Sequence, residues 1–179
     1  MRVNRRKLGV SAFRLVLCCV GAMGIADAAP QVRAMPQGMA MLTIEIDGAT
    51  ILAHFRAPRA TLVGFDGAAR NAQERETLGL ARENLRNGTG MMRFDTQAAC
   101  SLAEVVLKGD AARGAGVADE IGVDYRFACL SPEHLDSVAL GFFIGFPALE
   151  RVLVRYRTGE GRGGAELTQG NPVVGFVPF

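Results

Sequence analysis

Histidine is scarce in this chain of 179 residues, and tryptophan is absent. The two histidines, His54 and His134, form no His-x-x-x-His pair and no cluster with cysteine, and no serine stands in a nucleophile-elbow motif. The sequence therefore gives no basis for a zinc enzyme or a serine hydrolase, and we expect a protein without enzymatic activity. We expect His54 to lie within a strand and His134 on the surface of a helical turn, each with a structural role.

A large excess of either charge is also missing. The chain has 20 basic and 18 acidic side chains, for a formal net charge of +2, which argues against a nucleic-acid-binding protein. Hydrophobic residues make up 49% of the sequence, and the 22 glycines follow no fixed period, which excludes a disordered or a collagen-like chain. At this length one globular domain is the natural expectation.

The first fourteen residues contain no acid but carry five of the basic side chains. They precede an apolar run of about eleven residues, too short to cross a bilayer, where roughly twenty are needed. Ala26-Asp27-Ala28 follows as a small-x-small site. This order is typical of a secretory signal peptide, so we predict that residues 1–28 are removed by cleavage between Ala28 and Ala29.

Export has two consequences for the rest of the chain. Residues 29–179 would form the mature domain, in the periplasm or secreted and without a transmembrane anchor. This domain keeps 15 of the basic and 17 of the acidic residues, so its net charge becomes −2. Arg5-Arg6 leaves twin-arginine export open beside the general secretory route.

Cleavage would also remove Cys18 and Cys19, leaving only Cys100 and Cys129. In an oxidising compartment two remaining cysteines usually pair, and strand-like residues surround both of these. We favour a structural disulfide between two strands. A redox-active or metal-binding pair is the alternative, although the Cys-x-x-Cys spacing is absent.

The periodicity of hydrophobic residues indicates an α+β domain with a largely antiparallel sheet and one main helix. Residues 42–46 and 50–56 alternate on either side of Asp47-Gly48, as in a hairpin. Further strands are predicted at residues 101–107, 123–129, 138–146 and 151–157. The helix begins at Asn71, with Glu74 able to reach back to the cap, and ends at Asn87-Gly88.

Two glycine-rich stretches have no regular pattern. Residues 108–122 read as a mobile loop between the strands that carry the two cysteines. Gly159-x-Gly161-x-x-Gly164 has the letters of a dinucleotide-binding loop, but too little chain follows for a helix and a second parallel strand. We interpret it as a glycine-rich hairpin.

Three methionines share one side of the first strand. Met35, Met39 and Met41 have the parity of Thr43 and Glu45, opposite to the apolar side of that strand. Thioethers are ligands for soft cations such as Cu(I). They are a candidate metal site, with packing against a loop or plain exposure as the alternative.

Several short motifs, in their order along the chain, resemble the periplasmic zinc-uptake family of ZrgA type. The motifs are Gly38-x-Ala40-x-Leu42-x-Ile44, Pro58, Leu62-Val63-Gly64-Phe65-Asp66, Ala99-Cys100, Tyr125-x-Phe127-x-Cys129-x-x-Pro132-x-x-Leu135, Phe142-x-x-x-Phe146-Pro147, Ala165-x-Leu167-Thr168 and Asn171-Pro172. The resemblance implies a periplasmic protein of zinc uptake, and it places both cysteines where the family has its pair.

The chain departs from the family where the resemblance implies metal ligands. A His-x-His-Gly element reads Met35-Pro36-Gln37-Gly38, and a Gly-Phe-Glu-His segment reads Gly64-Phe65-Asp66-Gly67. The histidine-rich loop corresponds to residues 108–122, which contain no histidine. The chain therefore resembles a divergent member without the histidine-rich metal segments.

From these patterns we expect a non-enzymatic accessory protein of zinc or metal uptake and homeostasis, with weakened or altered metal binding. Zinc, from the family resemblance, and Cu(I), from the methionines, are the candidate metals. Components of a metal transporter or another envelope protein are the candidate partners. The alternative is a structural or partner-binding envelope protein that has lost metal binding.

Overall fold

The computed structural model describes residues 34–109 and 119–176. The chain enters a hairpin of β1 (Met39–Asp47) and β2 (Thr50–Pro58), in which Asp47 pairs with Thr50 around the predicted Asp47-Gly48 turn. Gly48 adopts a φ of +54°, a left-handed conformation that glycine tolerates. The alternation in residues 42–46 and 50–56 therefore predicted this hairpin correctly.

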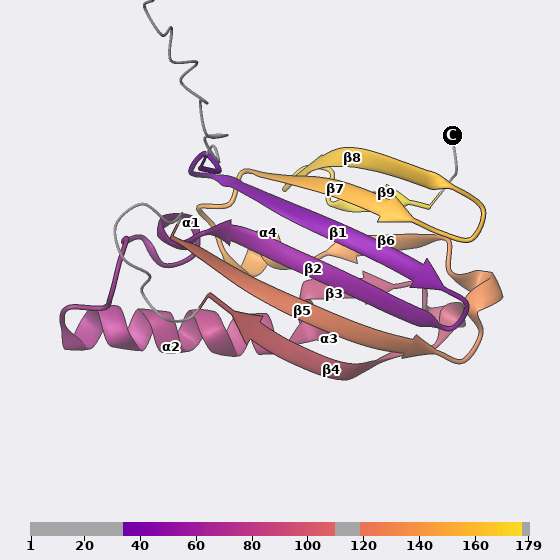
Figure 1. Ribbon diagram of the computed structural model, residues 1–179, viewed down its shortest axis with the longest axis horizontal. Helices are drawn as coiled ribbons and strands as arrows, with labels where there is room; N and C mark the ends of the chain where they lie inside the picture. The colour runs from indigo at the N-terminus through magenta and orange to yellow at the C-terminus, as the bar shows by residue number, and fades with distance from the viewer. Residues whose placement is uncertain (1–33, 110–118, 177–179) are drawn as a thin grey trace, which may run out of the picture. The chain divides into compact units, whose positions relative to one another are not determined.

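Six strands form the larger sheet, in the order β4-β5-β2-β1-β7-β8 (Figure 1). The further members are β4 (Cys100–Lys108), β5 (Glu120–Cys129), β7 (Arg151–Arg157) and β8 (Arg162–Thr168). Every neighbouring pair is antiparallel except β1 with β7, which run parallel. The glycine-rich segment after residue 157 makes the β7/β8 hairpin, as predicted.

One face of this sheet is covered by a second layer. Three short strands, β3 (Met92–Phe94), β6 (Ser137–Leu140) and β9 (Val173–Gly175), form a separate sheet, and β3 and β6 lie behind the large sheet in Figure 1. Aromatic rings join the layers: Phe55 of β2 stacks on Phe142 with ring centroids 4.0 Å apart. The apolar residues of the strands bury themselves on this side.

The main helix, α2 (Ala72–Arg86), begins and ends where its sequence predicts. The Asn71 side chain accepts a hydrogen bond from the Glu74 backbone N–H at 2.8 Å. The Glu74 carboxylate also reaches back, but to the Arg70 N–H at 2.6 Å and not to that of Asn71. Leu78, Ala81 and Leu85 are the buried residues of the helix.

The prediction of one strand over residues 138–146 is wrong. The chain leaves β6 after Leu140 and forms a helical turn, α4 (Phe142–Gly145). The Gly141 N–H donates to the Met91 carbonyl at 2.8 Å, and a Cβ at Gly141 would come within 2.0 Å of the Gly90 carbonyl oxygen. This close approach to α3 (Gly88–Met91) turns the chain, which no local pattern of hydrophobic residues reveals.

Four shorter elements complete the described chain. They are α1 (Arg59–Val63), which follows β2 directly, α3, and the 3-10 turns Thr96–Ala98 and Pro132–His134. The second 3-10 turn has proline at its first position, as predicted, and carries His134. Among the described residues, no helix is long and apolar enough to span a membrane.

The disulfide between Cys100 and Cys129 is present. It joins residues directly opposite each other on β4 and β5, so the predicted link between two strands is confirmed. The predicted signal peptide, with its cleavage between Ala28 and Ala29, lies outside the described residues. So does most of the predicted loop between the cysteines, residues 110–118.

Candidate functional site

Described residues at the ends of three segments, in which the family resemblance places metal ligands, lie near one another at one end of the large sheet. The first ends at Gly38, whose N–H donates to Thr61 Oγ1 in α1 at 3.0 Å. The second follows α1 and ends at Gly67, and the third begins after β4 and ends before β5, at Asp119. Because β2 leads straight into α1, the sheet and this helical turn bring positions separated by some eighty residues into one neighbourhood.

A buried arginine lies at the centre of this neighbourhood. Arg59, the first residue of α1, is 1% exposed. Its Nε donates to Asp119 Oδ1 at 2.8 Å, and its Nη2 donates to the Gly109 carbonyl at 3.2 Å. The Arg59 backbone N–H also donates to the Asp119 carbonyl at 2.7 Å. Arg59 thus holds together the two described ends of the connection between β4 and β5.

The Asp119 carboxylate is fully engaged by groups of the chain itself. Its second oxygen, Oδ2, accepts a hydrogen bond from the Gly67 N–H. Burial raises the pKa of this carboxyl, but the hydrogen bonds from Arg59 and Gly67 and the charge of Arg59 outweigh burial, so the pKa lies below its ordinary value of 3.8. At neutral pH the pair is an ionised guanidinium and carboxylate.

These residues do not fit a zinc ion. Within residues 34–109 and 119–176, no three side chains of histidine, cysteine, aspartate or glutamate are close enough to hold a metal together. Zinc sites in proteins use three or four such ligands. The nearby Asp119 already faces a guanidinium, which would repel a second cation, and Asp66 is exposed.

Met39 and Met41 lie where their parity in the first strand predicts, whereas Met35 precedes that strand and does not share its alternation. Met39 and Met41 are half-buried on the face of the large sheet opposite the core, and Met35 is half-buried just before β1. We call this face, which also carries Thr43, Glu45 and His54, the open face. The Arg56 Nη2 lies 3.3 Å from the Met41 sulfur, so a cationic group already occupies one side of that thioether.

His54 has a partner that the sequence alone does not indicate. On the open face its Nδ1 lies 2.8 Å from Asp124 Oδ1, and Lys108 pairs with the same carboxylate. Burial raises the pKa of Asp124, but hydrogen bonds from Lys108 and His54 outweigh burial and lower it. His54 and Asp124 meet because they are directly opposite each other in the β2/β5 register. That register depends on how the strands of the whole sheet are paired, and a single segment of the sequence does not reveal it.

His54 and Lys108 both pair with the Asp124 carboxylate, and among the described residues no hydroxyl or thiol is hydrogen-bonded to His54. A histidine that is hydrogen-bonded to a carboxylate can accept or donate a proton, but acyl transfer also needs a nucleophile within hydrogen-bond distance. The groove around it, of about 270 Å³, is lined by charged and aliphatic side chains of β2, β4 and β5. The other histidine, His134, lies 3.9 Å from the adjacent Glu133 carboxylate on its exposed 3-10 turn.

Comparison with known proteins gives one family. The family model described as ZrgA family zinc uptake protein matches residues 34–176, which is most of the chain. No curated protein matches the sequence.

Proposed function

Since the chain belongs to the ZrgA family of zinc uptake proteins, we propose that it is a non-enzymatic accessory protein of zinc uptake that works outside the cytoplasm with weakened or altered metal binding. The family match supports the zinc-related role. The basic and apolar N-terminal segment supports export, with the periplasm as the compartment. Components of a metal transporter, or another envelope protein, are the partners that such a role requires.

The observation that carries the weakened binding is the Arg59–Asp119 pair. Arg59 donates to both described ends of the third segment, and Asp119 accepts from Gly67 at the end of the second, so a buried cation lies where the family resemblance implies imidazole ligands. A guanidinium that donates to Asp119 and to the Gly109 carbonyl binds these segments together from within the protein. The fold of this region is therefore satisfied without a metal ion.

A zinc titration tests this proposal. By calorimetry, we expect the purified protein to bind Zn(II) with a dissociation constant of about 1 μM or weaker, since it lacks a set of three ligands. The double variant Met35→His/Gln37→His restores two imidazoles and should tighten binding by about tenfold or more. Arg75→His/Arg86→His, with both changes on exposed positions of α2 well separated along the helix, is the matched control and should not.

Two results would contradict the proposal. Nanomolar zinc binding by the unmodified protein would mean that a complete ligand set exists. No detectable binding of either Zn(II) or Cu(I), even at millimolar metal, would favour the alternative function, a structural or partner-binding envelope protein that keeps the fold and has lost the metal.

Altered specificity is the second part of the proposal, and the shared open face of Met39 and Met41 favours it. We expect weak Cu(I) binding that is lost when Met35, Met39 and Met41 are all changed to leucine, a substitution of similar volume. Arg56→Gln should strengthen binding, because it removes the cation 3.3 Å from the Met41 sulfur. Competition with a Cu(I) chelator under reducing conditions measures both effects, and unchanged affinity in the leucine variant would exclude the methionine site.

A further inference from the structure

The open face of the large sheet has an arginine-rich groove. It lies on the side of the sheet where β1, β7 and β8 are neighbours. The groove has a volume of about 460 Å³. Its side chains include three arginines and one glutamate, and its lining includes Thr43, Glu45, Arg155, Arg157, Arg162 and Gly163. Three positive charges therefore face one negative charge, although the predicted mature domain has a net charge of −2.

Only one of these three arginines is neutralised by the described part of the chain. Arg157 donates to Glu45 Oε1 at 2.8 Å, which accounts for the single acid of the groove. Within residues 34–109 and 119–176, Arg155 and Arg162 have no carboxylate partner, and both are exposed. Arg157 and Arg162 are also directly opposite each other in the β7/β8 register. Like charges in that position destabilise a strand pair, so an external anion would relieve the repulsion.

A glycine leaves the groove open beside Arg155. Gly164 is directly opposite Arg155, so β8 places no side chain beside Arg155 on the open face, whereas Gly163 is opposite Tyr156 on the core side. A Cβ at Gly163 would lie 2.3 Å from the Tyr156 hydroxyl oxygen, and one at Gly164 would lie 2.8 Å from the Val154 carbonyl oxygen. The strands approach too closely there for larger residues, and the guanidinium of Arg155 is left accessible from above.

We propose that this groove docks an acidic, extended segment of a partner protein. Arg155 and Arg157 are two residues apart on one face of a strand, which separates their Cα atoms by about 6.8 Å. An extended peptide with acidic residues at alternate positions has the same spacing, so successive acidic side chains would meet successive arginines. β8 is the last strand of the sheet, so a bound segment can run over its edge. The inference does not depend on metal binding and goes beyond the function proposed above.

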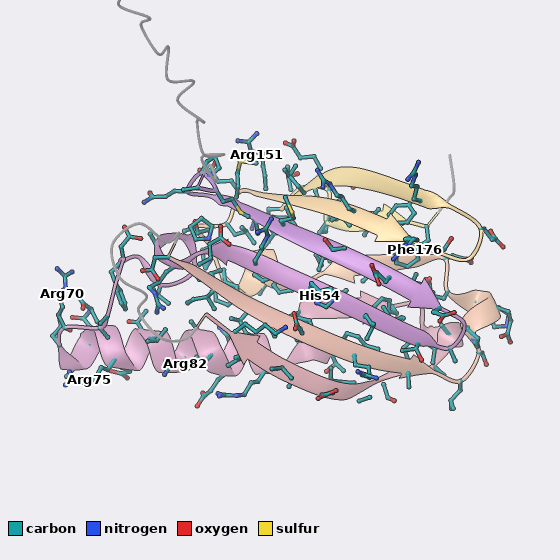
Figure 2. The ribbon with its side chains drawn as sticks, in the orientation of Figure 1. His54, Arg70, Arg75, Arg82, Arg151 and Phe176 are labelled. Carbon is teal, nitrogen blue, oxygen red and sulfur yellow. A yellow bond between two sulfur atoms is a disulfide. The ribbon has the colours of Figure 1, made fainter. Side chains whose placement is uncertain are left out.

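Fluorescence anisotropy with a labelled peptide Glu-Ser-Glu-Ser-Glu-Ser tests the proposal on the purified protein at low ionic strength. We expect measurable binding that weakens about tenfold in Arg155→Gln/Arg162→Gln, the effect of losing two exposed ion pairs. The matched control is Arg75→Gln/Arg86→Gln, which removes the same charge from α2, where Arg75 projects away from the sheet (Figure 2). This control variant should change the peptide affinity less than about twofold, because it alters only the long-range electrostatic attraction of the protein for the peptide.

Further measurements distinguish an extended acidic peptide from other ligands of the groove. The peptide Glu-Glu-Glu-Ser-Ser-Ser, with the same charge but without the alternation, should bind more weakly than the alternating peptide. Equal binding of both peptides, equal weakening by both double variants, or no binding by the unmodified protein would each overturn the proposal. Displacement of the peptide by low-millimolar inorganic phosphate, beyond the effect of chloride at the same ionic strength, would also overturn it and would indicate a small-anion site.

Discussion

Replacing Cys100 and Cys129 with serine should lower the free energy of unfolding by about 3.5 kcal/mol. The disulfide closes a loop with a sequence separation of 29, and in the chain-entropy model most of its effect is to limit the conformations of the unfolded chain. Urea unfolding followed by circular dichroism, without reductant, measures the difference.

The position of the disulfide adds a local effect to this global one. β4 is an edge strand that pairs only with β5, and the disulfide ties its first residue to the last residue of β5. Amide hydrogen exchange in β4 should therefore rise more than in the central strands β1 and β2 when the bond is removed. The control is the unmodified protein after reduction, which should lose the same stability. An unchanged urea midpoint in the serine variant would contradict the prediction.

Asp119→Asn should cost about 3 kcal/mol, because it leaves the charge of Arg59 buried without its counter-ion. Arg59 is almost completely buried, whereas the Asp119 side chain is 24% exposed, which places the effect at the lower end of the range for a broken buried pair. Asparagine keeps the shape and can still accept from the Gly67 N–H, so the loss reports on the charge. Thermal and urea unfolding of the variant provide the measurement.

Two companion variants separate charge from packing. Asp66→Asn, at an exposed neighbouring position, should change stability by less than about 0.5 kcal/mol. Arg59→Met/Asp119→Asn should be more stable than Asp119→Asn alone, because no unpaired charge remains inside the protein. If the double variant is the less stable of the two, the buried charge is not the source of the loss.

The same pair makes a prediction about pH. The pKa of Asp119 is lower in the folded chain than its ordinary value of 3.8, so the pair stabilises the fold above pH 3.8 and stops doing so as the pH falls through the folded-state pKa. The difference in unfolding free energy between the unmodified protein and Asp119→Asn should have its full size at pH 7 and should shrink below pH 3.8. A difference that stays constant down to pH 2 would contradict the role of the carboxylate charge.

Patterns along the chain predicted much of the large sheet. Residues that alternate between apolar and polar form β1, β2, β5 and β7, because every second side chain of a strand faces the same side. The pairing of Cys100 with Cys129 followed from elimination and from strand-like flanks, and the β4/β5 register places them opposite each other. The strand predicted over residues 138–146 failed because contact between Gly141 and α3 is a property of the folded chain.

The candidate sites also divide into features that the sequence reveals and features that only the folded chain reveals. The missing histidines were evident from the sequence, since the absence of a residue type needs no structure to establish it. That a buried Arg59 joins Gly109 and Asp119, the described ends of the segment without histidine, was not evident, because Arg59 and Asp119 lie sixty residues apart. The arginine groove was hidden too, since Arg157 and Arg162 become neighbours only through the β7/β8 register.

The sequence by itself therefore determined the α+β class, the hairpin of β1 and β2, the limits of α2 and the chemistry that the chain lacks. Such features depend on neighbouring residues, through side-chain periodicity, turn residues and helix caps. Only the tertiary structure decided the parallel pairing of β1 with β7, the burial of Arg59 against Asp119 and the gathering of three arginines around one acid in the groove of the open face. Those features depend on which distant strands become neighbours and in which register, and that choice is made by packing of the whole core.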